Sequence, residues 1–474
     1  MAYRLLFLLI AAFSLTACPG DGDNGGTSPV SPTGTVVYLA DQSTIGVFEL
    51  YLAPSGTKLN PPLVAGGSVT SFALTPDATA VVYIADQEQN DVFELWRVNL
   101  ASPGVSTKLN GLLAAGGGVE EFAVTPDNTA VVYRADQTTD NVIELYRTVF
   151  SGGANAKLNP NYTLGQNVDA FALLPNSTGV IYRANQDNAA VMELYRALFA
   201  SPGIITPAIS GVLIPGQNVE AFSPTPDSAN VVYIANRPVA TKQVFIAPAS
   251  GGGSIQINGV LTANGDVTAF AITPDGLSVV YRADQDFDEV FELYRTVIAS
   301  APTNIKLNPP FAQTSNRDVT VFGVIPDSTG VVYVADQSTD EVFELFRTLF
   351  SGGNSQLNSA FLLGFQDVVD FVVFPNSSGV VYKADENTDG INEIYRAVFG
   401  VPGATRINPP LLILGQNVLT YTVSPDSASA IYRANQDNVA VVELYRTAFS
   451  ALGTSAKQNP SLVPGQNVTD FTVK

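Results

Sequence analysis

Oxygen-bearing side chains alternate with spacers in one short stretch of this sequence, "DENTDGINE" at 385–393. Positions one, three, five and nine of the stretch carry Asp385, Asn387, Asp389 and Glu393, and Gly390 stands at the bend. Calcium binds several oxygen ligands around one small volume, and alternate residues of a curling loop can supply them. The stretch therefore predicts a calcium site, and the alternative is an ordinary polar turn.

Three further stretches have the same rhythm, at 136–144, 284–292 and 336–344. Their candidate ligands are Asp136, Asp140 and Glu144, then Asp284, Asp286, Asp288 and Glu292, then Asp336, Asp340 and Glu344. The four stretches resemble the short calcium loops of integrin alpha-chain propellers, which lie in β-hairpins. That resemblance implies that calcium would hold the crowded carboxylates together. The alternative is a set of Asp and Asn turns, with each Glu paired to an Arg on a neighbouring strand.

Other chemistry is excluded by composition. The chain has 474 residues, no histidine and one cysteine, Cys18. Histidine-based catalysis, thiolate zinc sites and internal disulfides are therefore ruled out. With 43 acidic and 23 basic residues the net charge is -20, so the surface repels nucleic acid and attracts cations or basic partners.

The first residues read as a targeting segment. "MAYRLLFLLIAAFSLTAC" has Arg4, then an apolar run too short to span a membrane, which is typical of a secretory signal. "LTAC" at 15–18 resembles a bacterial lipobox, which implies cleavage after residue 17 and lipidation of Cys18. Residues 18–34 are rich in Gly, Pro, Asp and Ser and should form a flexible tether reaching at most about 55 Å.

The resemblance implies a protein anchored in the bacterial envelope by lipid alone. Enteric lipoproteins with aspartate after the cysteine stay at the inner membrane, whereas Pro19 follows here. We therefore expect the periplasmic face of the outer membrane or the cell surface.

Internal repeats fill residues 35–474. The tyrosine of a "VVY" motif or a close variant recurs nine times, 45 to 52 residues apart, at Tyr38, Tyr83, Tyr133, Tyr182, Tyr233, Tyr281, Tyr333, Tyr382 and Tyr432. Each copy has a leading strand, a Pro-Asp or Pro-Asn turn, the "VVY" strand, the polar hairpin, an "ELYR" strand and a short fourth strand. Four strands per repeat predict an all-β propeller of four-stranded antiparallel blades.

The ends of the repeat region are complementary. The first copy lacks a leading strand, and the final "GQNVTDFTVK" is a leading strand with nothing after it. This predicts one nine-bladed ring closed by the C-terminal strand, because closure removes an exposed edge. Two smaller rings or an open arc are the alternatives, and the divergent fifth copy near 226–260 is where a division would fall.

The order "TPD…VVY…ADQ…ELYR" resembles the TolB-like propeller repeat over nearly all of residues 35–474. The hairpins here are longer, and the blades more numerous, than in TolB itself. The resemblance therefore implies the fold and leaves a TolB-type role open.

Two groups of repeated polar residues have structural explanations. The basic residues after the "VVY" tyrosine are expected to pair with acids on neighbouring strands; they are Arg134, Arg183, Arg282, Lys383 and Arg433. "GQNV" precedes several leading strands, and these connections should crowd the same rim as the polar hairpins.

Three functions remain open from the sequence. The first is a non-enzymatic binding or scaffold module, expected to be a monomer, that binds a protein or glycan through its loop rim. The second is a lactonase or glycan-cleaving hydrolase that uses carboxylates in the central channel. The third is a structural surface or adhesion protein. Because the repeats show no added cluster of catalytic residues, the sequence favours the binding module.

Overall fold

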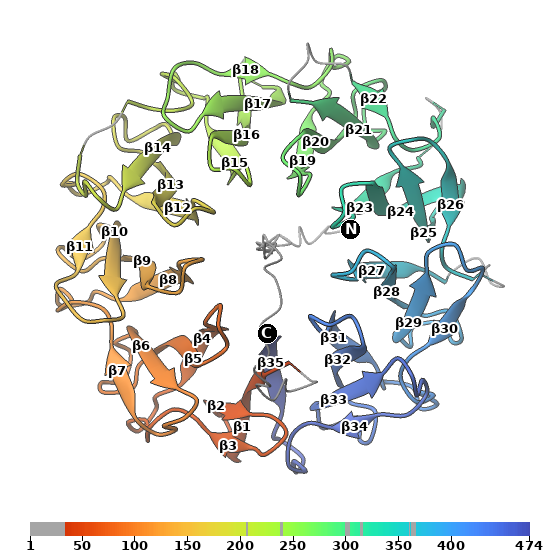
Figure 1. Ribbon diagram of the computed structural model, residues 1–474, viewed down its shortest axis with the longest axis horizontal. Coiled ribbons are helices and arrows are strands. Elements are labelled where there is room, and N and C mark those ends of the chain that lie inside the picture. Colours follow the sequence, from red (N-terminus) through yellow and green to blue (C-terminus); the bar gives the residue numbers. More distant parts are fainter. Residues whose placement is uncertain are drawn as a thin grey trace, which may run out of the picture.

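Nine β-sheets form one closed ring over the residues that the structure describes (Figure 1). The structure is a computed structural model, and it describes residues 34–204, 207–237, 240–298, 304–312, 316–359, 361 and 366–474. Within these ranges no helix is assigned, so none is present that is long and apolar enough to cross a membrane. Cys18, the signal segment 1–17 and all of the tether except Gly34 lie outside the described residues.

The leading strands lie innermost, around the centre of the ring (Figure 1). They are β4 Val69–Leu74, β8 Val119–Val124, β12 Val168–Leu173, β15 Val219–Pro224, β19 Val267–Ile272, β23 Val319–Val324, β27 Val368–Val373, β31 Val418–Val423 and β35 Val468–Val473. The second strands are β1 Val36–Thr44, β5 Ala80–Ala85, β9 Ala130–Ala135, β13 Gly179–Ala184, β16 Asn230–Asn236, β20 Ser278–Ala283, β24 Gly330–Thr339, β28 Gly379–Ala384 and β32 Ser429–Ala434.

The third and fourth strands complete each blade toward the periphery. The third strands are β2 Val47–Leu52, β6 Glu94–Asn99, β10 Glu144–Val149, β14 Glu193–Leu198, β17 Lys242–Pro248, β21 Glu292–Val297, β25 Val342–Leu349, β29 Glu393–Val398 and β33 Glu443–Ala448. The short fourth strands are β3 Thr57–Lys58, β7 Ser106–Lys108, β11 Ala156–Lys157, β18 Ile255–Gln256, β22 Ile305–Lys306, β26 Asn354–Gln356, β30 Ala404–Arg406 and β34 Ala456–Lys457.

Blades are numbered from the N-terminus, so blade 1 holds β1–β3 with β35, and blade 9 holds β31–β34. All pairings within the blades are antiparallel, and blade 4 (β12–β14) has three strands among the described residues. The ring is single, so the alternatives of two rings or an open arc are wrong. Blade 5, the most divergent in sequence, lies within the ring like the others (Figure 1).

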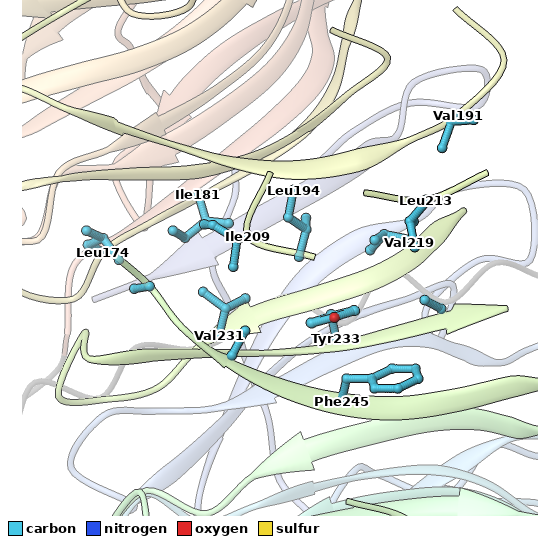
Figure 2. Packing of buried hydrophobic residues seen from close by; sticks show 13 residues of the cluster. Leu174, Ile181, Val191, Leu194, Ile209, Leu213, Val219, Val231, Tyr233 and Phe245 are labelled. Atoms are coloured by element: carbon cyan, nitrogen blue, oxygen red, sulfur yellow. The ribbon is translucent and has the colours of Figure 1, made fainter. Parts of the chain in front are cut away.

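The second strand of each blade is buried on both faces, because neighbouring blades cover it from either side. In β5 the side chains of Val81, Val82 and Tyr83 are all 0% exposed. Figure 2 shows one such contact, where Leu194 and Ile209 of blade 4 face Val231 and Tyr233 of blade 5. A strand with no solvent-facing side loses the polar alternation of an ordinary antiparallel sheet, which explains the unbroken "VVY" motif.

Aromatic side chains form a row across each blade. In blade 6, Phe270, Tyr281 and Tyr294 stand opposite one another on adjacent strands. The two tyrosine rings stack with centroids 5.5 Å apart and planes 19° apart. Cross-strand aromatic pairs stabilise antiparallel sheets beyond the area that they bury. The recurring tyrosines are therefore core residues.

The Pro-Asp turns join leading to second strands on one face of the ring, called here the turn face. In blade 6, Asp275 accepts hydrogen bonds from the Thr273 hydroxyl at 2.5 Å and the Leu277 amide at 2.9 Å. The Asp275 amide donates to Oγ of Ser328 in the turn of blade 7, at 3.0 Å. The turns thus close themselves locally and also link neighbouring blades.

The C-terminal strand completes blade 1, as the complementary ends predict. β35 pairs with β1, which places Phe471 opposite Tyr38. The Lys474 amide donates to the Thr35 carbonyl at 3.0 Å, and at the other end the Asn467 amide donates to Oδ1 of Asp41 at 2.6 Å. The ring is therefore closed by hydrogen bonds and packing between its two chain ends.

Deletion of residues 466–474 tests this closure. The truncated protein loses the innermost strand of blade 1 and exposes apolar surface together with an open edge, so we expect a large fall in melting temperature and aggregation. Scanning calorimetry and light scattering measure both effects. The control moves residues 466–474 to directly before Thr35, which should restore the melting temperature. A truncated protein that melts within a degree or two of the full chain would refute closure by β35.

Candidate binding face

The face opposite the turns is called here the hairpin face. It is built from the hairpins between second and third strands, together with the connections that precede the leading strands. Side chains of the "GQNV" connections hold the two together: Nε2 of Gln466 donates to the Gln42 carbonyl at 2.8 Å, and Nε2 of Gln166 to the Gln186 carbonyl at 2.6 Å. The prediction that these loops crowd one rim is confirmed.

The first hairpin position, Asp or Asn in every copy, is a structural anchor. In blade 6, Oδ1 of Asp284 accepts the Asp266 amide at 2.5 Å, and Oδ2 accepts the Glu289 amide at 3.1 Å. Asp385 does the same with the amides of Asp367 at 2.7 Å and Gly390 at 3.0 Å. Both carboxylate oxygens of the predicted first ligand are thus engaged by backbone donors. The same residue ties each hairpin to its own connection.

The residue before the leading strand links neighbouring blades through its side chain in all blades except blade 3, where it is Gly118. Oδ1 of Asn467 accepts the Val442 amide of the blade 9 hairpin at 2.8 Å, while its own amide bonds Asp41 of blade 1. Asp318 makes the corresponding bond from the Phe291 amide at 2.7 Å. Burial raises the pKa of the Asp318 carboxyl, with the Phe291 hydrogen bond opposing that rise. A chain of hydrogen bonds therefore runs from hairpin to hairpin around the ring.

The ninth hairpin position is a buried carboxylate that belongs to a different cluster. Glu292 is 0% exposed. Its Oε2 accepts a hydrogen bond from the Tyr294 hydroxyl at 3.2 Å and forms an ion pair with Lys306 at 2.5 Å. Its other oxygen accepts the Phe311 amide at 2.9 Å. Equivalent pairs join Glu49 to Lys58, Glu94 to Lys108, Glu144 to Lys157, Glu393 to Arg406 and Glu443 to Lys457.

The alternative of an Arg partner on a neighbouring strand holds in blade 8, where Arg406 pairs with Glu393, whereas in the other ion pairs the fourth strand supplies Lys. The sequence does carry a signal for the pairing, since blade 5 has lost all three members together. There Gln243, Phe245 and Gln256 occupy the positions of the Glu, the Tyr and the Lys. The joint loss indicates that the three residues interact. An alignment of the nine repeats with one another would have shown that these three positions change together.

The surroundings of the tyrosine and the lysine in this cluster raise the pKa values of both groups. Burial raises the pKa of Tyr51 to about 12, opposed by its hydrogen bond with Ser43 and reinforced by the charge of Glu49. Burial disfavours the Lys306 ammonium, yet its bonds to Asp286 and Glu292 raise the pKa of Lys306. The ion pair therefore contributes its full stability below the ordinary lysine pKa and loses it as pH rises through the raised value. The cluster behaves as structural support at neutral pH.

The middle positions of the predicted calcium loops also have protein partners. Asp286 forms an ion pair with Lys306 at 2.7 Å, and Nδ2 of Asn387 donates to Glu393 at 2.9 Å. Among the residues that the structure describes, no group of three or more Asp, Glu, His or Cys side chains is arranged to hold a metal ion. The loops resemble the integrin pattern in sequence, but their oxygens face backbone amides and cations of this fold. Calcium binding stays a prediction.

Of the basic residues after the "VVY" tyrosines, Arg134, Arg183 and Lys383 pair with leading-strand acids as expected, whereas Arg282 and Arg433 donate to a carbonyl and to a threonine hydroxyl. Arg134 contacts Glu121 at 2.9 Å and donates to the Val168 carbonyl of the next blade at 2.8 Å. Lys383 contacts Asp370 at 2.9 Å and the Leu419 carbonyl at 3.2 Å. The leading-strand carboxylates Glu121 and Asp370 are thereby paired with cations, whereas burial raises the pKa of Asp470, whose Oδ1 accepts the Phe471 amide at 2.8 Å.

Two equivalent grooves lie between blades. One of about 370 Å³ lies between blades 7 and 8, lined by Ser359, Phe361, Glu386, Asn387, Tyr395, Ala404 and Arg406. The other, of about 300 Å³ between blades 8 and 9, is lined by Pro409, Pro410, Leu411, Gln436, Asp437, Tyr445, Ser455 and Lys457. Burial raises the pKa of Glu386, which replaces the glutamine found at that hairpin position in most blades.

No family model and no curated protein matches this chain. Among solved structures, the chain is similar to a eukaryotic initiation factor with 11% identity and a TM-score of 0.56, covering 90% of this chain and 96% of that one. It also matches one of two prolyl endopeptidases with 10% identity and a TM-score of 0.48, covering 79% of this chain and 55% of that one. This chain thus spans about half the length of that enzyme.

A third match is an oligogalacturonate lyase in complex with manganese, with 13% identity and a TM-score of 0.43, covering 77% of this chain and 98% of that chain. Likeness at such low identity shows the propeller fold and carries no activity over to this chain. The TolB-like repeat was not matched by any family model, so it stays a resemblance in sequence.

Calcium binding is tested best at the positions that do not anchor the hairpin. The prediction requires millimolar calcium, and not magnesium, to raise the melting temperature, with dissociation constants on the order of 10⁻⁴ to 10⁻³ M. The combined variant Asp286→Asn, Asp288→Asn and Asp389→Asn should reduce that rise and stay folded in chelator. A melting curve of the wild type that is indifferent to calcium would refute the prediction.

Blade 7 offers a direct test of the buried cluster. It keeps Glu344 but has Phe346 and Gln356 in place of Tyr and Lys, and Oε2 of Glu344 is buried without a hydrogen-bond partner. Phe346→Tyr supplies the missing hydroxyl, so we expect about 1.5 kcal/mol of stabilisation in urea unfolding. The matched control, Tyr294→Phe in blade 6, removes the same contact and should destabilise. Equal unfolding midpoints for all three proteins would contradict this role.

Proposed function

We propose that this protein is a lipid-anchored, non-enzymatic binding module of the bacterial envelope, which presents its hairpin face to a partner. The observation that carries the proposal is the direction of β1, which runs from the turn face to the hairpin face. The described chain therefore begins at Gly34 on the turn face, where Lys474 also lies beside Thr35. An anchor at Cys18 would attach the flexible tether at the turn face, so the hairpin face would carry no attachment and stay free.

The state of the channel carboxylates supports binding over hydrolysis. A glycan-cleaving hydrolase needs two carboxyl groups free to act as acid and as base or nucleophile. Glu121, Asp169, Glu220 and Asp370 are instead paired with Arg134, Arg183, Lys242 and Lys383. Such pairing engages these four carboxylates with cations of the ring, which disfavours them as groups for proton transfer.

The anchor and the orientation can be tested together. Metabolic labelling with a palmitate analogue should mark the wild type and not Cys18→Ala. Because Cys18 is the one cysteine of the chain, Leu412→Cys on the hairpin face and Val401→Cys on the turn face each add a unique thiol. With the acylated proteins bound to vesicles, spin-labelled lipid should quench a fluorophore at position 401 more than one at 412. Equal palmitate labelling, or stronger quenching at 412, would refute the proposal.

A further inference from the structure

The most exposed aliphatic side chains of the described residues all lie on the hairpin face. Six of them are between 78% and 95% exposed, and all six are on the connections that precede leading strands: Leu112, Leu164, Val212, Val260, Leu412 and Leu414. On the turn face the most exposed aliphatic is Val105 at 69%. Because water-exposed aliphatic surface is unfavourable, clustered exposure of this kind marks an interaction site.

One part of this surface is denser than the rest and is called here the apolar arc. It follows blades 8, 9 and 1 and consists of Ile45, Leu412, Ile413, Leu414, Val439 and Val463, which are each at least 50% exposed. A Cβ built on Gly415 would lie 4.0 Å from Cγ1 of Val439, and one on Gly465 would lie 3.3 Å from Cδ1 of Ile45. The two hairpin side chains thus lie against the connections that carry the other four.

The charge around the arc decides what can cover it. Many cationic side chains are engaged in contacts within the fold. The fourth-strand lysines pair with buried Glu. Arg147, Arg295 and Arg347 lie over Phe rings of the next blade. Only blade 5 has basic residues in its hairpin, whereas Asp389 and Asp437 are exposed in the hairpins beside the arc, with Oδ2 of Asp437 also 3.1 Å from Nζ of Lys457. The excess charge of -20 is therefore carried largely by surface carboxylates.

A second copy of this chain or an anionic membrane would bring like charge to the same surface and be repelled. We propose that the apolar arc binds a partner protein through a cationic amphipathic segment, with aliphatic side chains on the arc and Lys or Arg beside Asp389 and Asp437. This inference rests on the proposed function and names the class of partner. Binding of this kind is the helix-in-groove or strand mode, in which one apolar side of a short segment is buried.

The arc also spans the closure of the ring. Val463 precedes the closing strand β35, and Ile45 belongs to the blade 1 hairpin, which Gln466 contacts at the Gln42 carbonyl. A segment that covers both side chains would hold the C-terminal strand onto blade 1. Because such a ligand binds only the closed ring, it must also raise the melting temperature.

The test uses purified full-length protein and two synthetic peptides of equal length, one of Leu and Lys and one of Leu and Glu with the same pattern. Fluorescence anisotropy should show the Leu/Lys peptide binding the wild type at least tenfold tighter than Leu412→Ser, Ile413→Ser, Leu414→Ser. The control variant Val105→Ser, Leu277→Ser, Val401→Ser on the turn face should bind like the wild type. The Leu/Glu peptide should not bind.

Equal binding by the two triple variants would show charge attraction alone and overturn the proposal. Self-association that is lost only in the 412–414 variant would also overturn the proposal, because the arc would then bind a second copy of the chain. Binding to zwitterionic vesicles that is lost only in this variant would overturn it too, because the arc would then bind lipid. These readouts do not depend on Cys18. A negative result in the peptide experiment therefore says nothing against the lipid anchor or the orientation. A negative result in the palmitate or quenching experiment likewise leaves the peptide experiment valid.

Discussion

A blade of this protein has two apolar faces, and each face is kept from water only by the next blade. The second strand shows the constraint most clearly, since Val131, Val132 and Tyr133 are all fully buried although they point to opposite sides of β9. An open row of such blades would leave an apolar sheet at each end, whereas a ring leaves none. Closure by β35 is thus required by the same burial that stabilises each blade.

The repeated polar residues follow from that ring. Bringing nine blades together places many backbone amides of the connections close to the hairpins, and buried amides need acceptors. Asp or Asn at the first hairpin position supplies one acceptor, and Asn or Asp before the leading strand supplies another toward the preceding blade. The buried Glu and its Lys then join the third strand to the fourth. Most of the recurring ionisable residues are therefore required for assembly.

Features that differ between blades are candidates for function, because the repeated features are explained by assembly of the ring. The unsatisfied Glu344 in blade 7, the basic hairpin of blade 5 and the aliphatic connection of 412–414 each break the repeat. The first is buried and changes stability, and Lys242 of the second is paired with Glu220. The third is exposed beside acidic hairpins, so it is the feature that a partner can reach.

Sequence alone determined the architecture, because strand pattern and turn chemistry are local and are repeated nine times. The blade count, the order of strands and the borrowed C-terminal strand all follow from the spacing of the "VVY" tyrosines and the incomplete first copy. Spacing could not show what the carboxylates face. Asp284 and Glu292 stand in one hairpin as calcium ligands would, yet the fold brings the Asp266 amide to the first and Lys306 to the second. Those partners come from the connection and the outer strand of the same repeat, 18 and 14 residues away, and the packing of these elements onto the hairpin places them. The same holds for the apolar arc, since Ile45 and Gly465, which follows Val463 by two residues, become neighbours only when the ring closes.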